Sequence, residues 1–229
     1  MPERSRIVTS SQSGPHQGLS RRVARALTHP LRKPLAAHTR EAFAAADAWR
    51  AERAGAPLIL DAGCGVGLST RHLAERHPEC AVIGIDRSAD RLSRDHGPLP
   101  DNARLVRADL VDFWRLALAD GWHPARHYLL YPNPYPKAAH LKMRWQGHPV
   151  FPAILALGGR LELRSNWRLY VEEFALALEQ ATGRRGAVEG FDPGGDFLTP
   201  FERKYHHSGQ PLWRLVVELP YRPELLPVA

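Results

Sequence analysis

The chain has 229 residues, of which 44% are hydrophobic and 24% charged, a composition typical of a folded globular protein and not of a disordered or collagen-like chain. No apolar run reaches the roughly 18 residues that a transmembrane helix needs. The first residues hold no apolar stretch typical of a secretory signal. We therefore expect a cytoplasmic protein with no membrane partner, acting as a monomer or a homodimer.

The net charge of +7 comes from the N-terminal part of the chain. The first 40 residues hold eight bases and one acid, whereas the rest holds 23 of each. Lys and Arg displace counterions from phosphates, so a basic arm on a neutral body indicates a polyanionic partner. The alternative is a solvated, partly disordered tail. We predict a basic arm at residues 1–36 and one domain at residues 37–229.

The expected elements run in chain order from a short basic helix within GLSRRVARAL to a final pair of strands. Helices are expected at residues 38–53, 67–77, 87–95, 110–118, 150–157 and 167–181. Strands are expected at residues 57–63, 81–86, 103–109, 126–132, 159–166, 187–192 and 211–219. The last two strands are expected to pair antiparallel, with TPFERKYHH in the loop between them.

This alternation of short apolar strands and helices predicts βαβ units and a parallel sheet covered on both faces. Seven strands with a late hairpin match the Rossmann-like sheet of class I methyltransferases better than a six-stranded dehydrogenase sheet. The predicted fold class is therefore α/β, with a seven-stranded, mostly parallel sheet and helices on both faces.

A glycine loop follows the first predicted strand in LILDAGCGVG. Gly63, Gly65 and Gly67 stand where the backbone has to turn sharply and approach a ligand closely. Asp61 lies two residues before the first of these glycines. A carboxylate at that point suits a ligand with a cationic amino group, such as S-adenosylmethionine, and would repel the pyrophosphate of a dinucleotide.

Two more acids end the second and third predicted strands. Asp86 is suited to bind the two ribose hydroxyls of the cofactor, and Asp109 to accept a hydrogen bond from its adenine amino group. We therefore predict an S-adenosylmethionine site. The alternatives are a nicotinamide cofactor and a tight turn without a ligand. Cys64, inside the loop, has no convincing His partner and is expected to be a small buried residue.

A second motif, YPNPYPKAAHLKMRW at residues 131–145, follows the fourth predicted strand. Strand ends of this kind line the ligand crevice in open parallel sheets. We therefore expect four residues to face the transferred methyl group: Asn133, Pro134, Tyr135 and Lys137. Residues 121–161 hold five Lys or Arg and no acid, which is the basic rim that a nucleic-acid substrate needs.

At these motifs the sequence resembles the bacterial tRNA (guanine-N7-)-methyltransferases, which methylate a guanine in the tRNA variable loop. The resemblance covers roughly residues 57–219. This chain has PNPYPKAAH where the family has P-D-P-W-P-K-K-R-H, SNWRLY where it has T-D-W-x-x-Y, and TPFE where it has T-x-F-E. The resemblance implies a methyltransferase that uses S-adenosylmethionine and acts on tRNA.

The resemblance also implies roles for individual residues. The cofactor would be bound by Asp61, Gly63, Gly65, Gly67, Asp86, Asp109 and Asn133. The tRNA or its target guanine would be bound by Lys137, Asn166, Thr199, Phe201 and Glu202. Asn133 takes the place of the family's proposed catalytic Asp, so it is our candidate catalytic residue.

Asn133 and Asn166 stand where the family has aspartates, which leaves two alternatives open. Amino-group methyltransferases use an Asn-Pro-Pro-aromatic turn, so a base amino group or another small substrate is one alternative. A non-catalytic RNA-binding paralogue is the other.

Several of these residues also have simpler interpretations. Asn166 is suited to cap the helix that follows it, and Glu202 with Arg203 and Lys204 is typical of a solvated charge cluster. Trp145, in its basic setting, is a candidate platform for a base. The twelve histidines are scattered, so no metal site is expected.

Overall fold

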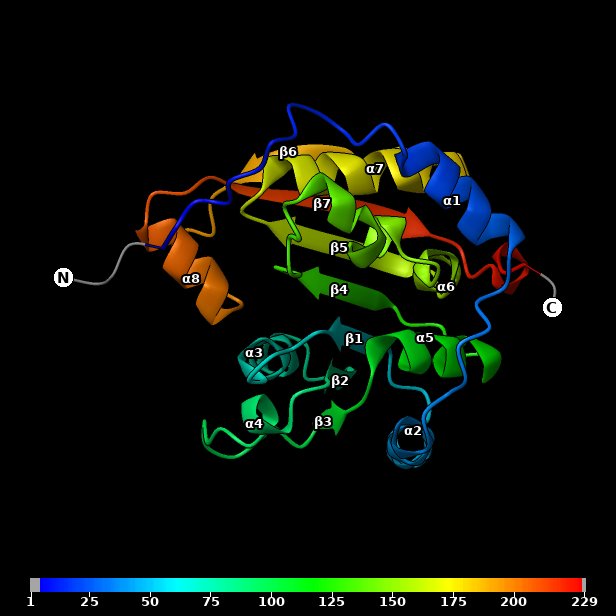
Figure 1. The fold of residues 1–229 in the computed structure, drawn as a ribbon. Coiled ribbons are helices and arrows are strands. Elements are labelled where there is room, and N and C mark those ends of the chain that lie inside the picture. Colours follow the sequence, from blue (N-terminus) through cyan, green and yellow to red (C-terminus); the bar gives the residue numbers. More distant parts are fainter. Residues whose placement is uncertain (1–4, 228–229) are drawn as a thin grey trace.

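The computed structural model describes residues 5–227, and within them the chain forms one sheet with helices on both faces (Figure 1). The strands are β1 (Leu58–Ala62), β2 (Ala81–Asp86), β3 (Ala103–Arg107), β4 (Arg126–Leu130), β5 (Gly159–Ser165), β6 (Ala187–Phe191) and β7 (Leu212–Leu219). The α-helices are α1 (Leu19–Thr28), α2 (Ala37–Ala51), α3 (Leu68–Arg76), α4 (Ala89–Leu92), α5 (Leu110–Ala119), α6 (Phe151–Ala156), α7 (Arg168–Thr182) and α8 (Pro200–His207). Short 3₁₀ helices are η1 (Ala138–Met143), η2 (Trp145–Gly147) and η3 (Pro223–Leu225).

The seven strands lie in the order β3-β2-β1-β4-β5-β7-β6. Strands β1 to β5 pair in parallel, and β7 runs antiparallel to both β5 and β6. This confirms the predicted mostly parallel sheet and its late antiparallel pair. In Figure 1 the arrowheads of β1, β4 and β5 point the same way, so their carboxyl ends share one edge, near which α3 and α8 also lie.

The central strands are almost continuously apolar in sequence because the core covers both of their faces. Every residue of β1 and β2 is buried, as expected for parallel strands covered on both faces. Along β1, Leu58 and Leu60 face the larger cluster, formed with α2, α5, α6 and α7, while Ile59 faces the cluster that includes Leu73 of α3. The alternation follows from the two-residue period of a strand.

The largest difference from the predicted elements is α8, because TPFERKYHH was expected to form a loop and forms a helix. The Thr199 side chain accepts a hydrogen bond from the Glu202 N–H, and Pro200 stands at the first helical position. Thr, Pro and Glu at this spacing form a helix start signal. Helix α4 is also shorter than the predicted helix 87–95.

The N-terminal arm packs onto the body of the protein over its described length. Helix α1 lies against α7, and Leu19, Val23 and Ala26 are buried there. The arginines of α1 are therefore held on a fixed surface. The boundary between arm and domain at residue 36 stays a prediction. Among residues 5–227, no helix has the length and apolar character needed to cross a bilayer.

Candidate active site

The glycine loop between β1 and α3 has the backbone conformation that its sequence predicts. Gly63, Gly65 and Gly67 have φ angles of 88°, 61° and 79°, a region that side chains with a Cβ rarely adopt. A Cβ on Gly67 would lie 2.8 Å from Leu105, whereas one on Gly65 would meet no atom within 4 Å. The loop thus packs closely at its helix end and presents open backbone at Gly65.

Asp61 is a buried carboxylate, and one of its two oxygens accepts no hydrogen bond from the described residues. Its Oδ2 accepts hydrogen bonds from the hydroxyls of Ser69 (2.6 Å) and Thr70 (2.7 Å). Its Oδ1 is buried and has no partner in the described part of the chain. Burial raises the pKa of Asp61 to about 6, against the lowering effect of the two hydroxyls. A cation brought to Oδ1 would stabilise the ionised form.

Asp86 connects the ends of β1 and β2. Its Oδ2 accepts from the Gly65 N–H (3.0 Å) and its Oδ1 from the Ser88 N–H (2.8 Å). The structure therefore brings Asp86 to the glycine loop, as the sequence predicts. Each carboxylate oxygen has two acceptor sites, so both retain capacity for a ligand hydroxyl.

Asp109 stands further along the same edge, at the start of α5. Its side chain caps the helix by accepting from the Asp112 N–H (3.3 Å). It also lies 3.3 Å from the Lys33 ammonium of the arm, an ion pair that the sequence did not reveal. Burial lowers the pKa of Lys33, but contacts with Asp112 and Asp109 raise it more, so the net pKa lies above the ordinary value.

The segment 131–137, which we call the substrate loop, leaves the same sheet edge from β4. Tyr131 and Tyr135 have φ angles of 52° and 45°, a conformation that costs a non-glycine residue on the order of 1–3 kcal/mol. Asn133 is exposed, and its Oδ1 accepts from the Tyr135 N–H (3.3 Å). Lys137 is also exposed. The strain has to be held by contacts from elsewhere in the fold.

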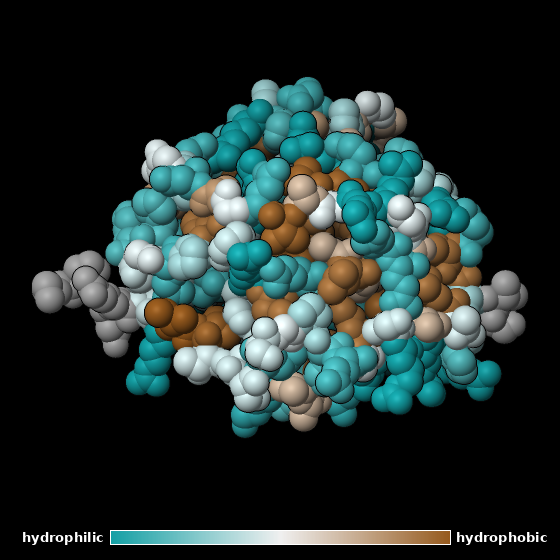
Figure 2. Space-filling view, turned by 90° about the horizontal axis from the view of Figure 1, so that it is seen from above, coloured by the Kyte–Doolittle hydropathy of each residue, from teal (hydrophilic) through white to brown (hydrophobic). Residues whose placement is uncertain are grey.

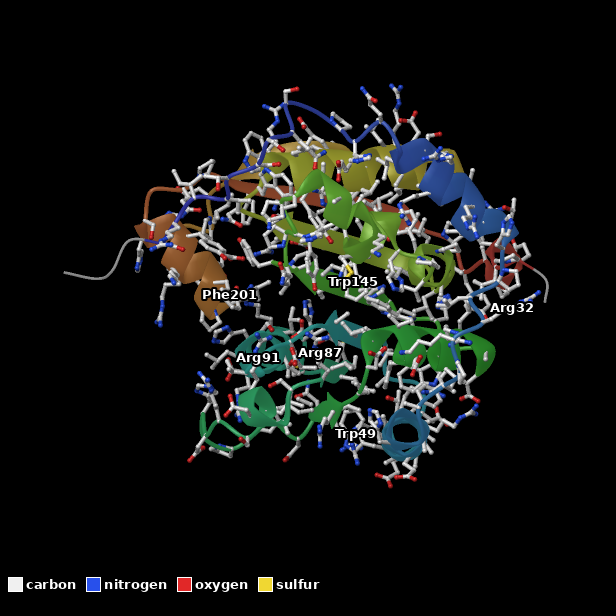
Figure 3. All side chains as sticks on the ribbon, in the orientation of Figure 1. Arg32, Trp49, Arg87, Arg91, Trp145 and Phe201 are labelled. Carbon is white, nitrogen blue, oxygen red and sulfur yellow. The ribbon has the colours of Figure 1, made fainter. Side chains whose placement is uncertain are left out.

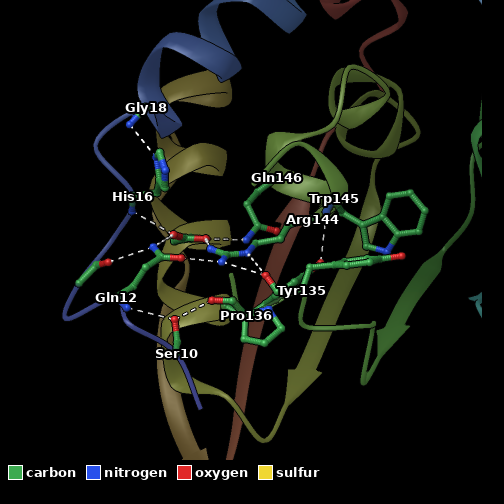
Figure 4. A network of polar contacts seen from close by, with 12 residues as sticks. Ser10, Gln12, His16, Gly18, Tyr135, Pro136, Arg144, Trp145 and Gln146 are labelled. Carbon is green, nitrogen blue, oxygen red and sulfur yellow. Dashed lines mark hydrogen bonds and ion pairs between the residues drawn. The ribbon is translucent and has the colours of Figure 1, made fainter. Parts of the chain in front are cut away.

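Arg144 and Glu173 supply these contacts from a buried ion pair (Figure 4). Both side chains are fully buried, and the Arg144 Nη1 lies 2.6 Å from the Glu173 Oε2. The Arg144 guanidinium also donates to the Tyr135 carbonyl through Nη2 (3.0 Å) and Nε (3.2 Å). Neither residue was predicted from the sequence. The available signal was an acid, Glu173, on the apolar stripe of the helix predicted at 167–181.

The arm joins the same network. The Gln12 Oε1 accepts from the Arg144 Nη2 (2.6 Å), and the His16 N–H donates to the Glu173 Oε1 (3.0 Å). The Ser10 hydroxyl donates to the Pro136 carbonyl (2.7 Å). The buried pair thus ties the arm, the substrate loop and α7 into one unit.

Helix α8 places an aromatic group beside the substrate loop. The ring of Tyr131 lies 5.7 Å from that of Tyr205, which stacks on Phe201 at 6.2 Å. Phe201 is 47% exposed and lies at the tip of α8 in Figure 3. Burial, together with the nearby Glu202 charge, raises the pKa of Tyr131 well above its usual value. Phe201 was predicted from the sequence as a site residue, whereas Tyr131 and Tyr205 were not.

Glu202 lies in the interior, which makes its interpretation as part of a solvated charge cluster wrong. Both of its carboxylate oxygens lie 3.0 Å from the Arg164 Nη1, and the side chain is fully buried. Thr199 serves as the helix cap. Arg203 and Lys204 are exposed.

Asn166 does not cap α7, so that interpretation is also wrong. The helix starts after Trp167, and Asn166 instead donates to the Gln210 Oε1 (2.8 Å). Gln210 in turn donates to the Ser5 carbonyl (2.8 Å). Asn166 therefore anchors the first described residues of the arm near α8.

The remaining candidates are Cys64, Trp145 and a small group of potential metal ligands. Cys64 is buried, and burial raises the pKa of its thiol well above the usual value. Trp145 packs edge-on against the buried Trp114, with ring centroids 4.8 Å apart. A group of potential metal ligands, His77, Glu79 and Cys80, lies between α3 and β2, away from the substrate loop.

The sequence is similar to known methyltransferases over most of its length. Residues 55–215 match a family described as putative methyltransferases. The tRNA (guanine-N(7)-)-methyltransferase of Hydrogenovibrio crunogenus is 30% identical over 176 residues, 71% of this chain and 72% of that protein. The tRNA (guanine-N(7)-)-methyltransferase of Methylobacillus flagellatus is 28% identical over 174 residues, 72% of each chain.

The fold is similar to that of solved methyltransferases. The 16S rRNA methyltransferase KamB superposes with a TM-score of 0.55 at 16% identity, covering 82% of this chain and 95% of that one. The 16S rRNA (adenine(1408)-N(1))-methyltransferase from Catenulisporales acidiphilia also gives 0.55, at 18% identity, covering 77% and 94%. At such identities the likeness shows the fold alone, and it confirms the predicted Rossmann-like class I methyltransferase sheet.

Proposed function

Because this chain belongs to the tRNA (guanine-N(7)-)-methyltransferase family, we propose that it transfers the methyl group of S-adenosylmethionine to N7 of a guanine in the tRNA variable loop. One observation carries the proposal. Strands β1 and β4 are parallel neighbours, so the glycine loop and the substrate loop leave the same edge side by side. A cofactor on the first loop and a base on the second would then be in reach of each other.

The residues at the glycine loop fit S-adenosylmethionine. The partnerless Oδ1 of Asp61 suits its ammonium, the open backbone at Gly65 leaves it room, and Asp86 has acceptor capacity for its ribose hydroxyls. Asp109, the N-cap of α5 two residues after β3, is our candidate for the adenine. When bound, the cofactor supplies an electrophilic methyl group on its sulfonium.

This chain's own contribution is to hold the base and exclude water. Guanine N7 is a lone-pair acceptor, so no base has to remove a proton from it. Catalysis then rests on placing N7 in line with the methyl group. Asn133 is our candidate for contacting the reacting base, as a neutral acceptor where relatives carry a charge.

The residues expected to bind substrate have different proposed roles. Phe201, exposed beside Tyr205, is proposed to contact the base by stacking. Lys137 is proposed to contact phosphate. Asn166, Thr199 and Glu202 are proposed to hold α8 and the arm in place, since each is engaged with protein groups.

The first experiment incubates the purified chain with labelled S-adenosylmethionine and unmodified bulk tRNA, and identifies the methylated nucleoside by mass spectrometry. We expect 7-methylguanosine, abolished in Asp61→Ala and retained in the exposed control Asp120→Ala. A nucleoside methylated on an amino group would favour the alternative of an amino-group methyltransferase. Cofactor binding with no methylated nucleoside would contradict the proposal and favour a paralogue with another acceptor or none.

A further inference from the structure

A basic groove lies between the arm and η1, beyond the substrate loop. It encloses about 490 Å³. One wall is formed by the arginines of α1 with His16 and Gly18, and the other by apolar side chains of η1. Its lining residues are His16, Gly18, Arg21, Arg22, Arg25, Ala138, Ala139 and Leu141. We call this surface the α1–η1 groove.

The lining offers hydrogen-bond donors and positive charge with no compensating acid. Arg21, Arg22 and Arg25 form no ion pair with any carboxylate among residues 5–227, and no acid lines the groove. Arg21 and Arg25 are both exposed and lie four positions apart on α1, a spacing at which like charges repel each other and destabilise a helix. An anion between them would remove that repulsion.

The arginines are presented at a fixed place because the arm is anchored on both sides of the groove. On the helix side, Leu19 and Val23 are buried against the body. On the other side, the Gln12 and His16 contacts to the Arg144–Glu173 pair hold the preceding loop (Figure 4). A solvated basic tail would lack this preorganisation, which lowers the entropy that a ligand has to overcome.

The shape and chemistry of the groove fit a phosphodiester backbone. No aromatic ring other than His16 lines it, so the lining is suited to bind phosphate oxygens and not to stack bases. Guanidinium groups bind phosphate oxygens in a two-pronged geometry. Seen from above, the molecule shows hydrophilic side chains with apolar patches between them (Figure 2), and the positive charge of the groove comes from its three arginines.

The groove is continuous in sequence with the substrate loop. The exposed Lys137 ends that loop, and η1 begins at the next residue, Ala138. A strand whose base enters at Asn133 would continue over η1 towards α1. Resting on the proposed function, we propose that the α1–η1 groove binds backbone phosphates of the tRNA next to its target nucleotide.

The test compares a variant that lacks the two exposed arginines of the groove with a control variant that lacks two exposed arginines elsewhere. The variant is Arg21→Gln/Arg25→Gln. The control, Arg32→Gln/Arg40→Gln, removes the same charge from exposed positions in the same basic region but outside the groove. The measurements are tRNA Kd at several salt concentrations, S-adenosylmethionine Kd by calorimetry, and thermal unfolding.

We expect the groove variant to weaken tRNA binding about tenfold or more and to reduce the slope of log Kd against log salt by about 1–2. S-adenosylmethionine binding and Tm should stay at wild-type values, and the control should show a much smaller change in tRNA Kd. Equal effects of the two double variants, or an unchanged salt slope, would overturn the proposal.

The outcome separates this inference from the proposed function. If the wild-type chain methylates tRNA and the groove variant binds tRNA normally, the proposed role of the groove is wrong and the proposed function is unaffected. If the wild-type chain binds tRNA through Arg21 and Arg25 but transfers no methyl group, phosphate binding by the groove is supported and the proposed function is wrong.

Discussion

The proposed cofactor side and the proposed substrate side of the site are built in opposite ways. On the cofactor side, β1 and its glycine loop lie in one short segment, and the buried Asp61 keeps an oxygen without a partner in the described chain. On the substrate side, the buried charge of Arg144 is fully engaged by groups 29 and 132 residues away in sequence. The unpartnered oxygen of Asp61 is available to a ligand, whereas the hydrogen-bonded Arg144–Glu173 pair holds the protein itself in shape.

The largest expected effect comes from breaking the buried pair. Arg144→Met leaves Glu173 buried without its countercharge, which should lower the free energy of unfolding by about 3–5 kcal/mol. Chemical denaturation measures this. The matched control is Arg168→Met, which removes an exposed pair with Glu172 on the same helix, where the loss should stay below about 1 kcal/mol.

A companion variant separates folding from positioning. In Arg144→Met/Glu173→Met, both charges are gone, so most of the stability should return. The Tyr135 carbonyl still lacks its donors, so the rate of methyl transfer to tRNA should remain low while S-adenosylmethionine binding is normal. Full recovery of the transfer rate in the double variant would show that Arg144 does not position the substrate loop.

The next largest effect tests the unpartnered oxygen of Asp61. Binding of the cofactor's ammonium needs the carboxylate, whose pKa in the free protein is about 6 because of burial and the neighbouring Asp86. The ionised fraction is high above that pH and falls below it. S-adenosylmethionine affinity should therefore drop about tenfold from pH 7 to pH 5, as measured by calorimetry.

Asp61→Asn provides the control for this pH dependence. The amide keeps the shape and an acceptor oxygen but has no charge to titrate, so affinity should be about 100-fold lower at pH 7 and flat between pH 5 and pH 7. A variant that retains the wild-type pH profile would assign the titration to another group.

The smallest expected effect is on the aromatic group of α8. Phe201→Ala should lower kcat/KM for tRNA about tenfold, since stacking on an aromatic ring contributes roughly 1–3 kcal/mol per base. The control is Leu176→Ala on α7, because Leu176 is 48% exposed and Phe201 is 47% exposed. Similar losses in the two variants would show that Phe201 contributes no specific contact.

The sequence alone was sufficient for most of the elements and for the conformation of the glycine loop. The strands, the positive-φ glycines and the acids at strand ends all depend on residues close together in the chain, where periodicity and turn chemistry act directly. The motifs at 131–145 and 199–202 also led to two segments that lie close together in the structure, and their role in binding substrate stays a prediction. The helix in TPFERKYHH was missed even though its start signal, Thr199 with Glu202, was present in the sequence.

Only the tertiary structure decided which polar residues are buried together. Nothing local to Gln12, Arg144 or Glu173 shows that they meet, and nothing local to Glu202 shows that it lies against Arg164 instead of in solvent. The same holds for the arm, whose charge was evident from composition but whose place against α7 depends on the burial of Leu19 and Val23. A buried charge needs an ion-pair or hydrogen-bond partner. Which residue becomes that partner depends on how segments far apart in the sequence pack together.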